Sequence, residues 1–231
     1  MKTVGVILAA GSGSRTGLSV PKQFLPFGKD GKTVLEYSTE AFQLNEGITQ
    51  IVIVTSLPFI ERVQQMVADN RWSKVSNVIE GGMERYDSSL AAVRLFADEP
   101  DTIMLFHDAA RPLVSQRIIS DTIKAMEEYN AVDVAIPTAD TIVQCDDCGS
   151  HMVSVPDRSL LWRMQTPQAF RQKTIALAYE KALQDPSFKA TDDCGTVLRY
   201  LPEEKVGIVR GDERNMKLTY AEDLPLMESL L

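Results

Sequence analysis

The chain has 231 residues, of which 44% are hydrophobic and 24% are charged. This length suits one large α/β domain with a substantial core and leaves little room for two. The formal net charge of −8 argues against nucleic acid as a partner, because proteins that bind nucleic acid need a basic surface. No run approaches the roughly 18 apolar residues of a membrane span, and the first strand begins without a cationic, apolar leader. We therefore expect a cytoplasmic protein with no membrane partner.

The chain opens with a predicted buried strand and a glycine-rich loop. Val4 to Leu8 is a short, nearly continuous apolar run, which is typical of a strand covered on both faces in a parallel sheet. Three glycines between residues 11 and 17 let the backbone turn and bring its amide groups close to an anion. Arg15 and Lys22 add positive charge to the same loop, so this stretch predicts a phosphate-binding site.

Spacing separates this loop from two better-known phosphate loops. A Walker A loop requires a Gly-Lys pair, which does not occur in this stretch. A dinucleotide fingerprint reads G-x-G-x-x-G and opens directly into a helix. Here the spacing is one residue longer and Pro21 interrupts the chain before a helix can begin, so an NAD-linked oxidoreductase is disfavoured. The remaining alternative is a flexible turn with solvated cations.

Downstream, predicted helices and strands alternate, which favours a doubly wound, mostly parallel, Rossmann-like α/β sheet. The first helix has a capping box, Thr33-Val-Leu-Glu36. Thr191-Asp-Asp193 has the composition of a helix cap. Strands are predicted at 48–55, 75–79, 102–106, 132–137 and 205–209. Helices are predicted at 33–44, 58–70, 90–97, 116–129, 171–183 and from about 221, with one more after residue 193.

The alternation breaks between residues 139 and 157. The runs 141–144 and 151–155 are strand-like and flank an Asp-Cys-Gly turn, so they predict a β-hairpin arm on a single domain spanning 1–231. An isolated two-stranded arm is marginal in water, and a second copy of the chain is the simplest partner for it. We expect a homodimer formed through this arm.

The same turn carries two of the three cysteines. Cys145, Cys148 and His151 have a spacing that zinc sites use, but a structural zinc takes four ligands and only the distant Cys194 remains. We interpret the segment as a hairpin turn. The odd number of cysteines disfavours a disulfide framework and fits a reducing compartment.

Polar segments follow two predicted strands at the ends where α/β sheets bind ligands. Gly81 to Ser88 follows the strand at 75–79, and an ordinary turn with a solvated Arg85 is the alternative there. Asp108 directly follows the apolar strand at 102–106, where Mg²⁺ is a natural partner for a carboxylate beside a triphosphate. An ion pair with Arg111, or a helix cap, is the other interpretation of Asp108. We expect His107 to be a structural or backbone-positioning residue and not a catalytic base.

Several segments resemble nucleotidyltransferases that activate sugar phosphates, above all the 2-C-methyl-D-erythritol 4-phosphate cytidylyltransferase family. These are Leu8-Ala-Ala-Gly-Ser-Gly-Ser-Arg15, Pro21-Lys-Gln-Phe24, His107-Asp-Ala-Ala-Arg-Pro112, Asp157-Arg-Ser-Leu-Leu-Trp162, Gln165-Thr-Pro-Gln168, Thr191-Asp-Asp193 and Asn215-Met-Lys217. The resemblance runs nearly end to end. It implies that CTP and the sugar-alcohol phosphate react to a CDP-linked product and pyrophosphate, with Mg²⁺, in non-mevalonate isoprenoid precursor synthesis.

The resemblance also implies roles for individual residues. Arg15 and Lys22 would stabilise the transition state, and Arg158 and Lys217 would position the incoming phosphate. Thr141 and Arg158 would come from the partner's arm. The implied CTP contacts are Ala9, Ala10, Gly11, Gly82, Ser88 and Asp108, with Asp108 also near the metal. The implied substrate contacts are Asp108, Arg111, Thr141, Arg158, Thr166, Thr191 and Lys217.

No nucleophile paired with a base is visible in the sequence, which fits this reaction class. A phosphomonoester has a second pKa of about 6, so it is already an ionised nucleophile at neutral pH. Two alternatives stay open: a ribitol 5-phosphate cytidylyltransferase, whose loops are similar, and a non-catalytic nucleotide-binding regulator.

Overall fold

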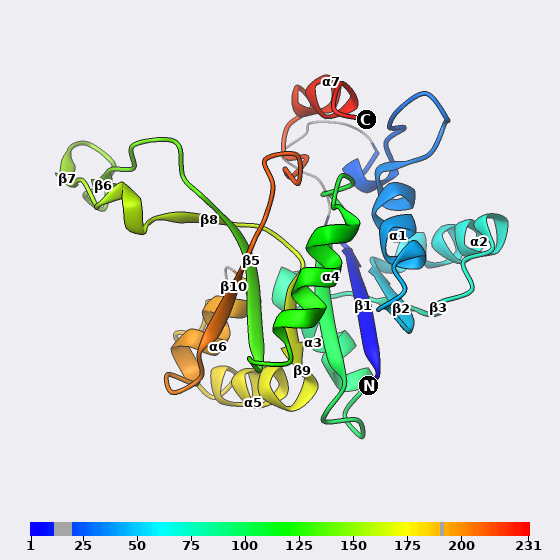
Figure 1. Ribbon diagram of the computed structural model, residues 1–231, viewed down its shortest axis with the longest axis horizontal. Coiled ribbons are helices and arrows are strands. Elements are labelled where there is room, and N and C mark those ends of the chain that lie inside the picture. Colours follow the sequence, from blue (N-terminus) through cyan, green and yellow to red (C-terminus); the bar gives the residue numbers. More distant parts are fainter. Residues whose placement is uncertain (12–19, 190–191) are drawn as a thin grey trace.

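The structure, a computed structural model, describes residues 1–11, 20–189 and 192–231. Its centre is a mixed sheet in which seven strands run in the order β10-β5-β9-β4-β1-β2-β3, while β8 pairs with β5 (Figure 1). β1 lies in parallel between β2 and β4, and β10 is parallel to β5. The strands are β1 Thr3–Ala9, β2 Gln50–Thr55, β3 Val75–Glu80, β4 Ile103–Asp108, β5 Ala131–Pro137, β8 Trp162–Met164, β9 Gln168–Arg171 and β10 Val206–Arg210.

Helices cover both faces of this sheet (Figure 1). The core on one face joins Ile51 and Ile53 of β2 to side chains of α1, α2 and α4. The core on the other face joins Val52 and Val54 to α3, α5 and α6. Alternate β2 residues therefore enter opposite cores, as a strand buried on both faces requires, and the predicted doubly wound, mostly parallel fold is confirmed. The helices are α1 Val34–Leu44, α2 Ile60–Asn70, α3 Arg85–Leu95, α4 Gln116–Ala125, α5 Gln172–Ala182, α6 Asp193–Tyr200 and α7 Asp223–Glu228.

Local sequence signals set several of these boundaries. Thr33 caps α1, since its hydroxyl accepts from the Glu36 backbone while the Glu36 carboxylate accepts from the Thr33 backbone, which completes the expected capping box. Short 3₁₀ turns at Lys22–Phe24 and Leu57–Phe59 precede α1 and α2. Within the described ranges no helix combines the length and the apolar content needed to cross a bilayer.

Two differences from the sequence-based expectations matter for the site. α4 ends at Ala125, four residues earlier than predicted, and continues only as turns. The segment after Pro167, where no strand was predicted, forms β9, which runs antiparallel between β4 and β5. Only four residues long and starting with a buried polar side chain, β9 lacks the apolar run that signals a central strand.

The segment between β5 and β8 leaves the body of the molecule (Figure 1). Its short strands, β6 Gln144–Cys145 and β7 Met152–Ser154, pair antiparallel, and a 3₁₀ turn follows at Arg158–Leu160. Asp146 organises the turn between the strands, because its carboxylate accepts from the backbone amides of Ser150 and His151. Among the described residues no three His, Cys, Asp or Glu side chains are placed to hold a metal, and Cys145 and Cys148 are exposed free thiols.

Asp133 is a buried carboxylate in the middle of β5, 5% exposed. Its Oδ1 accepts from Nε2 of Gln168 at 3.0 Å. Burial raises the pKa of Asp133 to about 7, and repulsion from Asp192 acts in the same direction. The hydrogen bond from Gln168 lowers the pKa but does not offset this rise. Since the folded-state pKa lies above the ordinary value of 3.8, the protonated form is favoured by folding. The contribution of Asp133 to stability is therefore complete below pH 4 and is lost as the pH rises through about 7.

We expect Asp133→Asn to raise the free energy of unfolding at pH 8 by roughly 1 to 3 kcal/mol and to change it much less at pH 5, because the amide keeps the acceptor and removes the buried charge. Urea unfolding at both pH values measures this. The exposed Asp98→Asn is the control for loss of one negative charge. An equal or larger stabilisation at pH 5 would contradict the assignment of a raised pKa to Asp133.

Candidate active site

The carboxyl ends of β4, β1, β2 and β3 lie side by side at one edge of the sheet. Leu8 pairs with Asp108 at the end of β1 and β4, and Ala9 pairs with Thr55 at the end of β2. From β1 the chain continues to β2 on one side, whereas β4 lies on the other side, so the strand order reverses here. Such a reversal opens a crevice beyond the strand ends, which is where open α/β sheets bind ligands.

The glycines after β3 allow a close approach to the first loop. A Cβ atom on Gly81 would lie 2.6 Å from the Cβ of Ala10 and 2.5 Å from the Ser88 hydroxyl. A Cβ on Gly82 would lie 2.1 Å from the Cβ of Asp87. Only glycine fits these positions, and its absent side chain lets the segments that carry Ala10 and Ser88 touch. The structure thus brings together four residues expected to contact CTP, namely Ala9, Ala10, Gly82 and Ser88, beside Gly11.

Asp108 lies at the centre of this edge and pairs with two cations. Its Oδ2 is 2.6 Å from Nζ of Lys217, and its Oδ1 is 3.3 Å from Nε of Arg85. Burial alone would raise the pKa of Asp108, but attraction to Arg85, Lys217 and Arg111 outweighs it and holds the pKa well below the usual range. Asp108 is therefore ionised at neutral pH. The alternative of a direct Asp108–Arg111 ion pair is wrong, because the carboxylate pairs with Arg85 and Lys217 while the Arg111 guanidinium donates to backbone oxygens.

Arg85 is a site residue that the sequence alone did not identify. Besides Asp108, its guanidinium contacts Asp193, whose Oδ2 lies 2.6 Å from Nη1. Asp193 is fully buried and also accepts from the hydroxyl of Tyr179 on α5. The alternative of a solvated Arg85 is wrong. Gly81 and Gly82 just before it were the one local signal, and the long-range partner on α6 has no signature in the sequence.

Asp193 also differs from its expected role. The residue that caps α6 is Asp192, whose carboxylate accepts from the backbone amide of Gly195 at 2.7 Å. Asp193 is the first residue of the helix and points its carboxylate at Arg85. Arg15 and Thr191 lie outside the described residues.

Lys22 is anchored at the same edge. Its Nζ donates to the backbone oxygen of Leu218 at 2.8 Å, next to Lys217. The neighbouring Gln23 is 3% exposed, and its amide donates to the backbone oxygens of Ala9 at 2.7 Å and Gly11 at 3.1 Å. Gln23, which the sequence did not single out, therefore ties the Lys22 turn to the end of β1.

Thr166 and Arg111 complete the group around Asp108. The backbone amide of Asp108 donates to the Thr166 hydroxyl at 3.1 Å. Arg111 donates from Nη1 to the backbone oxygen of Asn215 at 2.7 Å, and its Nε is buried without a partner among the described atoms.

Burial lowers the pKa of His107 to about 4, so its ring is neutral. It contacts the Thr166 hydroxyl and the backbone of Arg111.

Two expected site residues lie elsewhere in the single chain. Thr141 and Arg158 are exposed residues of the segment that leaves the body. Nη1 of Arg158 donates to the backbone oxygen of Ala139 at 3.2 Å, within that segment. One chain by itself therefore does not bring Thr141 and Arg158 to Asp108.

The donor set suits a magnesium ion that is held mainly by a substrate. Within the described ranges Asp108 is not part of any group of three metal-binding side chains. Both of its oxygens already contact cations, yet a carboxylate oxygen has a second lone pair. One such oxygen fits Mg²⁺, which in nucleotide sites takes one or two carboxylates, with phosphate oxygens and waters as its other ligands.

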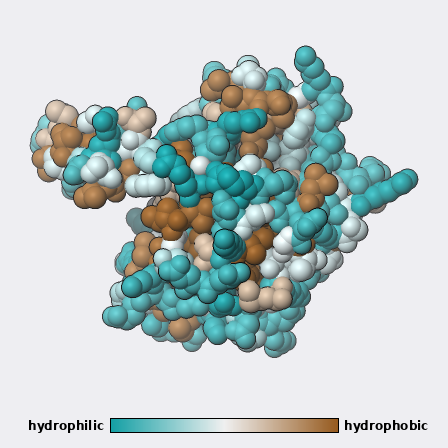
Figure 2. All heavy atoms as spheres, in the orientation of Figure 1, coloured by the Kyte–Doolittle hydropathy of each residue, from teal (hydrophilic) through white to brown (hydrophobic). Residues whose placement is uncertain are grey.

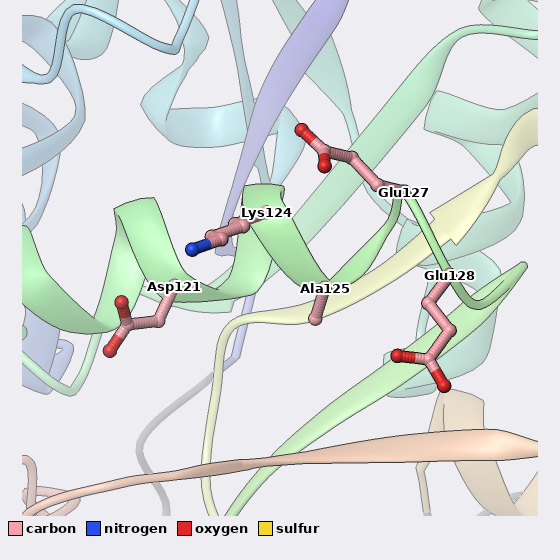
Figure 3. Close-up of a pocket in the computed structure, with 5 residues that line it drawn as sticks. All are labelled: Asp121, Lys124, Ala125, Glu127 and Glu128. Atoms are coloured by element: carbon pink, nitrogen blue, oxygen red, sulfur yellow. The ribbon is translucent and has the colours of Figure 1, made fainter.

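A separate hollow lies at the C-terminal end of α4 (Figure 3). It is lined by Asp121, Lys124, Ala125, Glu127 and Glu128. Three of these five side chains are acidic and would repel a triphosphate. Because α4 follows β4 and runs back along the sheet, its end lies at the edge opposite to Asp108. The candidate site is therefore the edge that carries Asp108.

Comparison with known proteins identifies a family for almost the whole chain. A family model described as 2-C-methyl-D-erythritol 4-phosphate cytidylyltransferase matches residues 3–231. A protein of Thermobifida fusca with that name is 44% identical over 234 residues, covering 100% of this chain and 93% of the relative. The bifunctional ribulose 5-phosphate reductase/CDP-ribitol pyrophosphorylase Bcs1 of Haemophilus influenzae is also 44% identical, over 99% of this chain but 48% of its own length.

Solved structures agree with the sequence relatives. The crystal structure of 4-diphosphocytidyl-2C-methyl-D-erythritol synthase from Anaerococcus prevotii superposes with a TM-score of 0.84 at 27% identity, over 99% of this chain and 95% of that one. Since the family model spans almost the whole sequence and the fold is shared, the chain belongs to the 2-C-methyl-D-erythritol 4-phosphate cytidylyltransferase family and is a nucleotidyltransferase.

Proposed function

We propose that this enzyme joins CTP and 2-C-methyl-D-erythritol 4-phosphate to a CDP-linked product and pyrophosphate. The observation that carries the proposal is the group of cations around the ionised Asp108. Lys217 and Arg85 contact its carboxylate, and Lys22 is anchored one residue from Lys217. These charges lie beside the close approach of Ala10 and Gly81, where a nucleotide can reach backbone groups. A site that must bind two polyanions requires such an excess of fixed cations.

The chemistry needs alignment and charge stabilisation. An oxygen of the sugar-alcohol phosphate, which is ionised at neutral pH, attacks the α-phosphorus of CTP. A new O–P bond forms, the bond to the β-phosphate breaks, and pyrophosphate leaves with the electron pair. No proton has to be removed from the nucleophile. Lys22, with Arg15 of the same loop, stabilises charge on the α-phosphate, and Lys217 positions the incoming phosphate.

Asp108 has two tasks in this proposal. Its negative charge keeps Lys217 and Arg85 in fixed positions before substrate binds, so these cations need little reorganisation during the reaction. Asp108 would supply one oxygen ligand to a Mg²⁺ ion bound with CTP, and that ion would supply charge neutralisation at the phosphates. Arg111 and Thr166, held beside Asp108, are proposed to contact the sugar-alcohol phosphate.

Ribitol 5-phosphate is the second candidate substrate. The Haemophilus influenzae relative named for CDP-ribitol is as similar to this chain, at 44% identity, as the Thermobifida fusca relative. Both substrates offer the same nucleophile, a phosphate monoester on a polyol. The family model favours the methylerythritol substrate.

We expect the purified protein, given CTP and Mg²⁺, to release pyrophosphate with a kcat/KM at least tenfold higher for 2-C-methyl-D-erythritol 4-phosphate than for ribitol 5-phosphate. A coupled pyrophosphate assay with each phosphate measures this. A preference for ribitol 5-phosphate would reject the substrate assignment. No release with either substrate, but measurable CTP binding, would favour a nucleotide-binding regulator.

Lys22→Ala should lower kcat by roughly 100-fold or more, because a preorganised cation at the reacting phosphate is worth about 3 kcal/mol or more in the transition state. The dissociation constant for CTP should change much less, since other groups bind the ground state. Single-turnover kinetics and calorimetry separate the two quantities. Lys173→Ala, which removes an exposed lysine that pairs with Asp101, is the control. An unchanged kcat for Lys22→Ala would rule out its assigned role.

We further propose that the segment 139–157 is an arm that forms a homodimer. β7 and the residue after it present apolar side chains to solvent in the single chain, with Met152 66%, Val153 59% and Val155 58% exposed. Figure 2 shows such side chains gathered on the projecting part of the molecule. A second copy would cover them and would carry Thr141 and Arg158 into the neighbouring site. The three free cysteines fit a reducing, cytoplasmic location.

Subunit mixing tests whether Arg158 acts in the partner's site. Lys22→Ala and Arg158→Ala homodimers should each be nearly inactive. After exchange, half of the dimers contain one chain of each kind, and one of their two sites combines an intact Lys22 with an intact Arg158. About a quarter of the wild-type activity should therefore return. If each arm serves its own chain, no mixed dimer has an intact site and no activity returns.

A further inference from the structure

His107 is the last residue but one of β4 and is completely buried. Its Nε2 lies 3.1 Å from the backbone oxygen of Arg111, and its Nδ1 lies 3.0 Å from the hydroxyl oxygen of Thr166. The Thr166 hydroxyl in turn accepts from the backbone amide of Asp108 at 3.1 Å. One imidazole ring therefore connects three residues that the proposed reaction uses.

The partners determine where the ring proton is. A backbone oxygen only accepts hydrogen bonds, so Nε2 must donate to Arg111. A second proton on a fully buried ring would be a buried charge, and the ring's partners are neutral: the Arg111 backbone, the Thr166 hydroxyl and the Thr166 backbone. Nδ1 is then an acceptor, and the Thr166 hydroxyl must donate to it. The ring is also held from one side by Phe42, at 5.2 Å between ring centres.

Because the Thr166 hydroxyl donates to His107, the hydrogen bonds that it can make to a ligand are restricted. Its single hydroxyl proton is engaged by His107, and one lone pair is engaged by the Asp108 amide. A hydroxyl oxygen has two lone pairs, so one remains for a ligand. A phosphate oxygen also only accepts and would be repelled there, whereas a polyol hydroxyl can donate to it. Thr166 is thereby suited to the sugar-alcohol part of the substrate.

We propose that His107 is a positioning residue in the neutral Nε2–H tautomer. Its ring connects Arg111 to Asp108 through the Thr166 hydroxyl, and it orients that hydroxyl so that the oxygen accepts from a polyol hydroxyl. The contact to Arg111 spans the tight turn in which the Arg111 amide donates to the Asp108 backbone oxygen at 2.9 Å. His107 thus acts on substrate binding through Thr166, Asp108 and Arg111. The part that concerns the polyol rests on the proposed function, and the tautomer does not.

Nitrogen NMR of the intact protein labelled with ¹⁵N-histidine tests the tautomer directly. The chain has two histidines, and the spectrum of His151→Gln, at the exposed arm, assigns the other. We expect a protonated Nε2 and an unprotonated Nδ1 for His107 at neutral pH, with or without CTP. Thr166→Val should shift the Nδ1 signal alone. A protonated Nδ1 in the wild type would overturn the proposal.

Kinetics test the positioning role. His107→Phe keeps a ring beside Phe42 and removes both hydrogen bonds, so the KM for the sugar-alcohol phosphate should rise at least tenfold while the KM for CTP stays within about twofold. His107→Asn can still accept from Thr166 and should recover part of this loss. Equal changes in both KM values, or none, would overturn the proposal. If His107→Phe fails to fold, the wild-type spectrum and His107→Asn decide.

The failure of the proposed function is distinguishable from the failure of this inference. Suppose that the wild-type protein shows the Nε2–H tautomer but does not turn over 2-C-methyl-D-erythritol 4-phosphate. This result would contradict the proposed substrate, whereas the hydrogen bonds assigned to His107 would stand.

Discussion

The site depends on one electrostatic arrangement, in which an ionised carboxylate at the end of a central strand holds two cations from distant parts of the chain. Asp108 contacts Lys217 and Arg85 directly, and Asp193 contacts the other side of the Arg85 guanidinium. Charges taken out of water are costly unless each is paired and hydrogen-bonded, and here every member has a partner. Cations that are already in place when the substrate arrives stabilise developing charge without reorganising the protein.

The fold makes this arrangement possible through the direction of its strands. β1 and β4 are adjacent and parallel, so the first loop and Asp108 emerge at the same edge. β9 lies antiparallel beside β4, and Thr166, two residues before β9 begins, contacts the backbone of Asp108. Its Gln168 also contacts both Asp133 and the amide of Asp193. An antiparallel strand begins at the edge where its parallel neighbour ends, and this direction places the residues that lead into β9 beside Asp108.

The arm separates two parts of the proposed chemistry. The body holds the groups assigned to the nucleotide and the reacting phosphate, whereas Thr141 and Arg158 lie on an exposed segment whose apolar side chains lack cover in one chain. Under the proposed dimer, binding of the second substrate would require a neighbour. That division would make activity depend on dimer formation, because the site of a monomer would have the cations of the body but would lack the Arg158 side chain that a partner supplies.

Much of this protein follows from local sequence. The apolar runs of β1, β2 and β4 predicted buried parallel strands, and Thr33 and Glu36 marked the start of α1, because these signals depend on neighbours in the chain. The segment from Gly81 to Ser88 was expected at a ligand-binding strand end, and there the structure shows Gly81 in close approach to Ala10. The order of motifs placed the chain in its family. The partners of Asp108, the roles of Arg85, Asp193 and Gln23, and the strand β9 were decided only by tertiary structure. Residues 85, 108, 193 and 217 are far apart in sequence, and no local pattern records which carboxylate meets which cation, since long-range packing alone brings them within hydrogen-bonding distance.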